Sequence, residues 1–86
     1  MKTEELNRQI TKLRNKDLPY TTDANAALEL WEELEGDDIF AWADMYRTDR
    51  DWQFRFWAGQ GYFTKTAKTF CEAICLVYCQ YKRIEQ

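Results

Sequence analysis

Apolar residues recur at helical spacing in the first stretch of the chain. They stand among Lys, Arg, Gln and Asn, at Leu6, Ile10 and Leu13. This spacing is typical of an amphipathic helix with a narrow apolar stripe. The helix must end near residues 15–17, because the residue before Pro19 disfavours α geometry. The thin stripe predicts that residues 1–17 form a helix on the surface of the domain.

A broader apolar stripe follows a polar loop. Its members share one face of a helix and are Ala24, Ala27, Leu28, Trp31 and Leu34. Asp23 or Thr22 suits the N-cap, since its side-chain oxygen can accept a free N–H of the first turn. Gly36 stands where a left-handed C-cap would end the helix. The pattern therefore predicts a second helix between these two caps.

Residues 39–46 fit two interpretations. Two sets of residues alternate along the segment: Ile39, Ala41, Ala43 and Met45 against Phe40, Trp42, Asp44 and Tyr46. This pattern is typical of a strand that is covered on both faces. The two alanines, with Asp38 as a cap, also permit a short helix. Aromatic enrichment favours the strand.

The clearest strand covers residues 52–57. Alternation separates two sets that point to opposite faces, Trp52, Phe54 and Phe56 against Gln53, Arg55 and Trp57. The polar residues 47–51 connect it to the preceding strand. Residues 58–61 supply two glycines for positive φ, which predicts a turn. Residues 62–64 then return as a neighbouring strand.

The last helix is predicted from Thr66, a candidate cap, to about Lys82. Apolar residues occupy nearly its whole circumference, namely Ala67, Phe70, Cys71, Ala73, Ile74, Cys75, Leu76, Val77, Tyr78 and Tyr81. Such a helix is either the central, most buried one of the domain, or it also meets a second subunit.

The order of these elements predicts an α+β fold. It reads helix–helix–strand–strand–strand–helix, with a small antiparallel sheet of about three strands packed with helices in a sandwich-like arrangement. A chain of 86 residues forms one domain, here residues 1–86, with residues 18–82 as its core unit. The open sheet edges and the apolar last helix also predict a homo-oligomer through the C-terminal helix or a sheet edge.

The charges are unevenly distributed along the chain. Its net charge is −3, yet residues 19–45 hold eight acids and no base. A basic nucleic-acid footprint is absent, so no direct contact with nucleic acid is expected. One interpretation of the acidic run is a solvated helix face. The other is a partner-binding surface that attracts a basic protein or copies the phosphate spacing of DNA, with the candidates Glu29, Glu32, Glu33, Glu35, Asp37 and Asp38.

Three cysteines follow one another at intervals of four residues. Cys71, Cys75 and Cys79 make an odd count on one helical stripe, which is a poor disulfide framework. A reduced, cytoplasmic compartment of the host cell is the resulting expectation. The chain has no His, so a zinc site is not expected. The cysteines are better explained as small core residues packed against a sheet. No apolar run reaches the length of a membrane span, and no membrane contact is expected.

The sequence lacks the signatures of an enzyme. Without His there is no His-based general base or Ser–His–Asp arrangement. Gly59-Gln60-Gly61 fits neither phosphate-binding glycine pattern and predicts a hairpin turn. Carboxylate pairs such as Asp37-Asp38 and Asp49/Asp51 are typical of solvated loops. We therefore expect a protein without enzymatic activity and without a cofactor.

Aromatic and basic residues near the hairpin form a second candidate surface. If Trp52, Phe54 and Phe56 face the core, Arg55 and Trp57 lie on the opposite face. The rings there could stack on the base of a nucleotide while an arginine meets its phosphate. The candidates are Arg47, Arg50, Arg55, Trp57 and Tyr62. The alternative is that a helix covers this face too, which makes Trp57 a core residue.

Several short motifs resemble a family of small phage and prophage proteins. They are Pro19-Tyr20-Thr21-Thr22-Asp23, Ala26-Ala27 and Trp31, then Trp52-x-Phe54, Thr66-Ala67 and Ala73-Ile74-Cys75. Together they are similar to the pattern of the phage ABA sandwich family, over roughly residues 18–80. The resemblance implies a bacteriophage origin and a sheet sandwiched by helices. It implies no catalytic residue.

Three functions follow as hypotheses. The preferred one is a small phage-type accessory protein that binds and blocks a host protein, for example a component of antiviral defence. The alternative is a small-molecule binder that sequesters a nucleotide signal. A structural or assembly protein of the phage particle is the third.

Overall fold

The computed structural model of the chain describes residues 3–37, 39–59 and 61–85. Its elements, in order, are α1 (Thr3–Arg14), α2 (Ala24–Gly36), β1 (Trp42–Arg47), β2 (Trp52–Ala58), β3 (Gly61–Ala67) and α3 (Phe70–Glu85). The strands form one antiparallel sheet in the order β1-β2-β3. The predicted α+β class and the predicted order of elements are confirmed.

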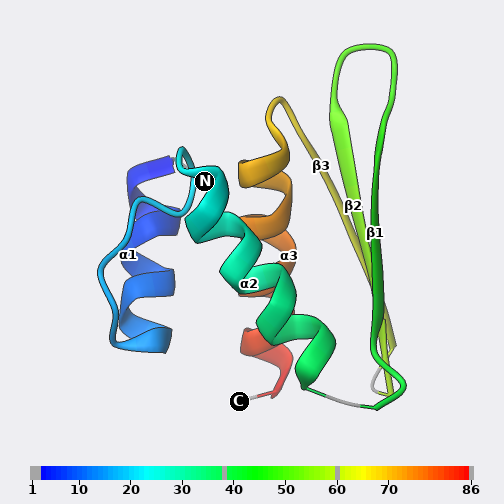
Figure 1. Ribbon diagram of the computed structural model, residues 1–86, viewed down its shortest axis with the longest axis horizontal. Helices are drawn as coiled ribbons and strands as arrows, with labels where there is room; N and C mark the ends of the chain where they lie inside the picture. Colours follow the sequence, from blue (N-terminus) through cyan, green and yellow to red (C-terminus); the bar gives the residue numbers. More distant parts are fainter. Residues whose placement is uncertain (1–2, 38, 60, 86) are drawn as a thin grey trace.

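The elements are arranged in layers. In Figure 1 the sheet is seen nearly edge-on at the right, and the three helices stand on one side of it. Helix α3 packs on β2 and β3, and α2 contacts β1. Helix α1 packs on α3 and forms the outermost layer. None of the described helices is long and apolar enough to cross a membrane.

Helix α1 is held by its narrow stripe. Leu6 and Ile10 are fully buried, while Leu13 at the end of the stripe is partly exposed. The helix ends at Arg14, and Asn15 follows with a positive φ of 55°. Asn is the residue that best tolerates this left-handed conformation after Gly, so it makes a natural helix stop. The predicted end of this helix is confirmed.

Helix α2 begins as predicted but ends differently. The Asp23 carboxylate accepts a hydrogen bond from the Asn25 N–H at 2.9 Å, which makes Asp23 the N-cap. The prediction of a left-handed Gly36 is wrong. The C-cap is Asp37, with right-handed angles (φ −75°, ψ −22°), and its N–H donates to the Leu34 carbonyl. Because this tightened last turn satisfies the carbonyl, no positive φ is required.

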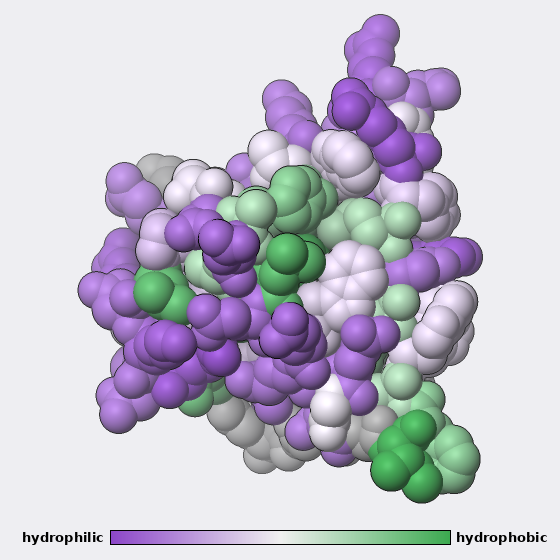
Figure 2. Space-filling view, in the orientation of Figure 1, coloured by the Kyte–Doolittle hydropathy of each residue, from purple (hydrophilic) through white to green (hydrophobic). Residues whose placement is uncertain are grey.

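Strand β1 resolves the ambiguity of residues 39–46. The strand interpretation is confirmed, but the strand begins only at Trp42. Ile39 and Phe40 precede it and are 91% and 77% exposed. Figure 2 shows a strongly hydrophobic green patch at the lower right, where the chain passes from α2 to β1 in Figure 1.

The prediction that this strand is covered on both faces is wrong. Ala43 is buried, whereas Trp42 and Tyr46 are 52% and 41% exposed. Side chains at these positions alternate between the two faces of the sheet. The helices therefore cover one face of β1 and leave the other uncovered.

The second hairpin is longer than predicted. Gly61 has a φ of 143°, in the region that side chains rarely adopt, so the glycine is required at the turn. Strand β3 continues to Ala67 instead of ending near residue 64. It does so because β2 offers it a partner at every position, down to Trp52 opposite Ala67.

The start of α3 also differs from the prediction. Thr66 is not the cap, because it pairs with Gln53 inside the sheet. The helix begins at Phe70, and the Thr69 hydroxyl accepts the Glu72 N–H at 3.2 Å. A β-branched residue such as Thr suits both a strand and a cap. The length of β2 decides which threonine takes which place.

Helix α3 is the central helix, as one of the two interpretations predicted. Its apolar residues are almost all fully buried, namely Cys71, Ala73, Ile74, Cys75, Val77, Tyr78, Cys79 and Tyr81. Tyr81 packs edge-on against Phe56 and Phe63 of the sheet, with centroids 5.0 and 5.4 Å apart. The apolar circumference of α3 is thus covered by β2, β3, α1 and α2 within one chain.

The position of the cap gives a stability test. We expect Thr69→Ala to lower the free energy of unfolding by about 1 kcal/mol, because it leaves the Glu72 N–H without its acceptor. The matched control is Thr66→Ala at an exposed position of β3, with an expected change below about 0.5 kcal/mol. Urea denaturation measures both. A larger loss of unfolding free energy in Thr66→Ala than in Thr69→Ala would indicate that Thr66 is the cap.

Candidate functional site

One face of the sheet is turned away from the helices. Phe54, Phe56 and Phe63 point to the helices and are buried, so the residues alternating with them point outward. We call this outward side the open face and define it as Trp42, Asp44, Tyr46, Gln53, Arg55, Trp57, Tyr62, Thr64 and Thr66. None of the described helices covers it.

A row of three aromatic rings crosses one end of the open face. Trp42, Trp57 and Tyr62 stand opposite one another on β1, β2 and β3. The Trp42 and Trp57 ring centroids lie 4.4 Å apart, and those of Trp57 and Tyr62 lie 4.8 Å apart. Trp42 and Tyr62 are 52% and 48% exposed. This aromatic row stabilises the sheet and still presents large apolar surface to a partner.

An ion pair occupies the middle of the open face. Arg55 donates from Nε to Asp44 Oδ1 at 2.7 Å and from Nη2 to Oδ2. This fork geometry is the strongest form of a carboxylate–guanidinium pair. The guanidinium also lies 4.8 Å from the Tyr46 ring centroid and 5.1 Å from that of Trp57. Hydrogen bonding to Asp44 raises the pKa of Arg55.

A polar row completes the open face. The Tyr46 hydroxyl donates to Gln53 Oε1 at 2.5 Å. The Gln53 amide then donates to Thr64 Oγ1 at 2.9 Å. These bonds link all three strands and fix the direction of each side chain. From one end to the other, the face therefore carries an aromatic row, an ion pair and a polar row.

The structure brings together only some of the predicted nucleotide-binding residues. Arg55, Trp57 and Tyr62 lie side by side on the open face. Arg47 does not, because its guanidinium lies 5.2 Å from the Trp52 ring, on the opposite face. Arg50 is exposed in the loop between β1 and β2. The alternative in which a helix makes Trp57 a core residue is not found in the described part of the chain.

Sequence reasoning missed Trp42, Asp44 and Tyr46 as members of this face. They were assigned to a strand with two covered faces, so none of them was expected to meet solvent. A signal was available in the sequence. If a four-residue loop joins the two strands, residues 42, 44 and 46 pair with residues 57, 55 and 53, and all six positions share one face of the hairpin.

Two of the predicted partner-binding acids hold the helices together. Arg14 at the end of α1 donates to Glu33 Oε1 at 3.0 Å, and Tyr78 of α3 donates to Glu33 Oε2 at 2.5 Å. Lys16 donates to Glu29 at 3.1 Å. Hydrogen bonding to Lys16 lowers the pKa of Glu29. Glu29 and Glu33 are thus engaged in hydrogen bonds that hold α2 to α1, to the loop after α1 and to α3.

The remaining predicted acids are divided between structure and solvent. Asp37 accepts a hydrogen bond from the Tyr81 hydroxyl at 2.5 Å. Glu32 and Glu35 are exposed on α2. Asp38 lies outside the described residues. The acids of α2 therefore do not form one continuous, unengaged surface.

The three cysteines are free thiols inside the core. Burial raises the pKa of Cys79 to about 11, and burial also raises the pKa of Cys75 and Cys71. A thiol acts as a nucleophile or metal ligand in its thiolate form. Among the described residues, no group of three or more Cys, Asp or Glu side chains is placed to hold a metal ion.

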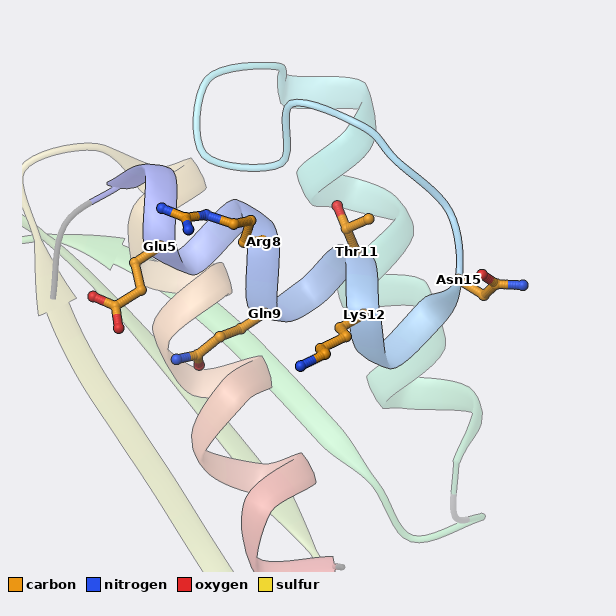
Figure 3. Close-up of a pocket in the computed structure, with 6 residues that line it drawn as sticks. All are labelled: Glu5, Arg8, Gln9, Thr11, Lys12 and Asn15. Atoms are coloured by element: carbon orange, nitrogen blue, oxygen red, sulfur yellow. The ribbon is translucent and has the colours of Figure 1, made fainter.

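A groove along α1 is shallow and comes from one helix. Its lining residues are Glu5, Arg8, Gln9, Thr11, Lys12 and Asn15. Figure 3 shows that their side chains fan outward from α1 and do not converge on a common point. A small-molecule site needs polar groups that converge from several directions. The groove therefore adds no second candidate, and the open face is the strongest one.

The chain shares its fold with a phage protein of known structure. No family model and no curated protein matches the sequence. The crystal structure of a phage protein from Bacillus cereus ATCC 14579 matches with a TM-score of 0.79, over 100% of this chain and 92% of the other, at 20% sequence identity. At this identity the likeness shows a common fold and does not carry a function.

Burial of the thiols gives a chemical test. We expect a thiol-specific disulfide reagent to react on the order of 100-fold more slowly with the native protein than with the denatured one, because each thiol must wait for local unfolding. Fast reaction of one thiol in the native protein would contradict the burial.

The raised pKa of Cys79 gives a test by pH. The folded chain keeps the Cys79 proton up to about pH 11, whereas the unfolded chain releases it at about pH 8.5. Unfolding free energy should therefore fall as the pH rises through this window.

Proposed function

We propose that this chain is a small phage-type accessory protein that binds another protein through the open face and blocks it. The observation that carries the proposal is the exposed aromatic row of Trp42, Trp57 and Tyr62 beside Arg55. Trp, Tyr and Arg are the residues that most often anchor protein interfaces, because they bury much area per ordered side chain.

The shape of the open face favours a protein over a small molecule. Ligand pockets surround most of a small molecule, whereas one layer of side chains on a sheet presents a flat surface. Three grooves lined by described residues follow α1, and none of them includes a residue of the open face. A flat surface with large rings matches the interfaces formed between proteins.

The charges on the open face argue against a phosphate ligand. Two donors of Arg55 are engaged by Asp44, so a phosphate would have to compete with a carboxylate already in place. Asp44 would also repel the incoming anion. Arg47 and Arg50 lie elsewhere and do not compensate. The face therefore suits an uncharged or mixed-charge protein surface better than a nucleotide.

Binding without catalysis is the mode of action that the residues support. The chain holds no His, and its thiols are buried with raised pKa values. General acid–base and nucleophilic catalysis need groups whose pKa lies near the working pH. A protein of this kind acts by occupying the surface of its target.

A phage context supports a host protein as the target. The fold is shared with a phage protein, and the motifs of residues 18–80 resemble the phage ABA sandwich family. Proteins of bacterial antiviral defence are the targets we infer first. The compartment in which such a target and three free thiols occur together is the host cytoplasm.

Capture of the target tests the proposal. We expect tagged protein to recover one stoichiometric protein from a lysate of host cells, and we expect the double variant Trp42→Ser, Tyr62→Ser to lose it. Removing two exposed anchors of an interface weakens binding by more than about 100-fold. The matched control is Leu28→Ser on α2, which is 43% exposed and should keep the target. Equal recovery by both variants would remove the open face from the binding surface.

A nucleotide panel tests the competing function. We expect no rise in Tm with cyclic or linear nucleotides, because a ligand raises Tm only when it binds the folded state. A rise that Arg55→Ala abolishes would assign the face to a nucleotide and contradict a protein target. Differential scanning fluorimetry gives the measurement, with Arg8→Ala on α1 as the control.

A further inference from the structure

Resting on the assignment of the open face as a protein interface, we propose that the free protein is a homodimer in which two open faces pack on each other. The second copy is thus the first partner of this face, and a target must displace it. The chemistry of the face itself points to this partner.

Any partner of the open face must match its three rows in order. The rows stand two residues apart along each strand, which is about 6.6 Å. They demand an apolar contact at Trp57, alternating charges at Asp44 and Arg55, and polar groups at Gln53. A surface with this sequence of properties at this spacing is the open face of a second copy.

One two-fold arrangement brings every row onto its match. Its axis runs parallel to the strands, between β1 and β2. Strand β1 of one copy then lies over β2 of the other, and the rows keep their positions along the strands. Trp42 meets Trp57 of the partner subunit, and Asp44 meets Arg55 of the partner subunit. Such an interface is isologous, so each contact occurs twice.

The charges select this arrangement over the other symmetric ones. An axis perpendicular to the strands through the ion pairs would place Asp44 on Asp44 of the partner subunit. An axis along β2 would place Arg55 on Arg55 of the partner subunit. Like charges in direct opposition disfavour both. With the axis between β1 and β2, four charges alternate in sign around the centre of the interface.

The available area indicates a reversible dimer. Strands β1 and β2 of each copy overlap, whereas β3 lies beside the overlap. Trp42 and Tyr46 are 52% and 41% exposed, which leaves about 100 Å² of each to be buried. With the other residues of these two strands, on the order of 400 Å² per copy is available. The total of about 800 Å² is below the size of a standard interface, which is typical of a weak, transient contact. The dimer should therefore dissociate in the high micromolar range, and a target can replace one copy.

The net charge of the chain opposes this dimer only weakly. Helix α2 holds four acids and no base, and it stands on the helical side of the sheet. In the proposed arrangement the two sheets lie between the two helical layers. The α2 acids of the two copies are thus more than a Debye length apart, about 8 Å at physiological salt.

Charge reversal on full-length protein tests the proposed dimer. We expect sedimentation velocity over the micromolar range to show wild-type protein at twice the mass of one chain, dissociating on dilution. Asp44→Arg makes the face wholly positive and Arg55→Asp makes it wholly negative, so each variant alone should be monomeric. Mixed in equal amounts, the two should form a heterodimer, because every contact across the interface then joins Arg to Asp.

The mixing result separates the interface from the internal ion pair. Each charge variant also loses the ion pair between Asp44 and Arg55 within its own chain. If this loss alone prevented dimerisation, mixing the two variants would not restore it. The matched controls are Glu32→Arg on α2 and Arg8→Asp on α1, which should both dimerise like wild type. Should a charge variant fail to fold by circular dichroism, Trp42→Gln replaces it, with an expected tenfold or greater weakening of the dimer. Wild-type protein that stays monomeric, a Trp42→Gln variant with unchanged dimerisation, or folded charge variants that do not associate on mixing would each overturn the dimer.

The dimer and the proposed function fail separately. Monomeric wild-type protein that still captures its target through Trp42 and Tyr62 would overturn the dimer and leave the function in place. A dimer that passes the mixing test, with no target lost in the Trp42→Ser, Tyr62→Ser variant, would overturn the function and leave the dimer. If both hold, adding purified target should convert the homodimer into a complex that contains one copy.

Discussion

The structure depends on the burial of α3. This helix is apolar around nearly its whole circumference. Burial of apolar surface is the dominant favourable contribution to folding, so the other elements must cover this helix. The sheet covers one side of it, and α1 and α2 cover the rest. Because a single chain of 86 residues completes this cover, the three helices all gather on one side of the sheet, and the other side is left uncovered.

Polar contacts then fix the relative positions of the three helices, which apolar burial alone does not determine. Glu33 accepts hydrogen bonds from Arg14 and Tyr78 and lies 3.6 Å from Lys82. This one carboxylate therefore meets all three helices. The Tyr78 hydroxyl is paired although its ring is buried, and burial together with this bond raises the pKa of Tyr78. Apolar packing alone permits helices to slide, whereas these directional bonds favour one register.

The elements were predictable from the sequence where one local pattern decides. The start of α2 at Asp23 or Thr22, the alternation of residues 52–57 and the apolar character of the last helix follow from local patterns. Predictions went wrong where a distant partner decides. Thr66 became a strand residue because β2 is long enough to pair with it, and Gly36 needed no left-handed turn. The β1 part of the candidate site, Trp42, Asp44 and Tyr46, was missed because no local pattern shows how many faces of a sheet the helices will cover.

The one-sided packing of the sheet divides the chain into two kinds of positions. Residues that point to the helices are constrained by close packing, since every exchange there alters a filled volume. Residues of the open face contact mainly one another across strands, as Gln53 does with Thr64. A substitution there changes cross-strand contacts and the exposed surface, while the packed volume between the sheet and the helices stays as it is. The fold therefore offers one side of the sheet whose surface chemistry can change without rebuilding the core.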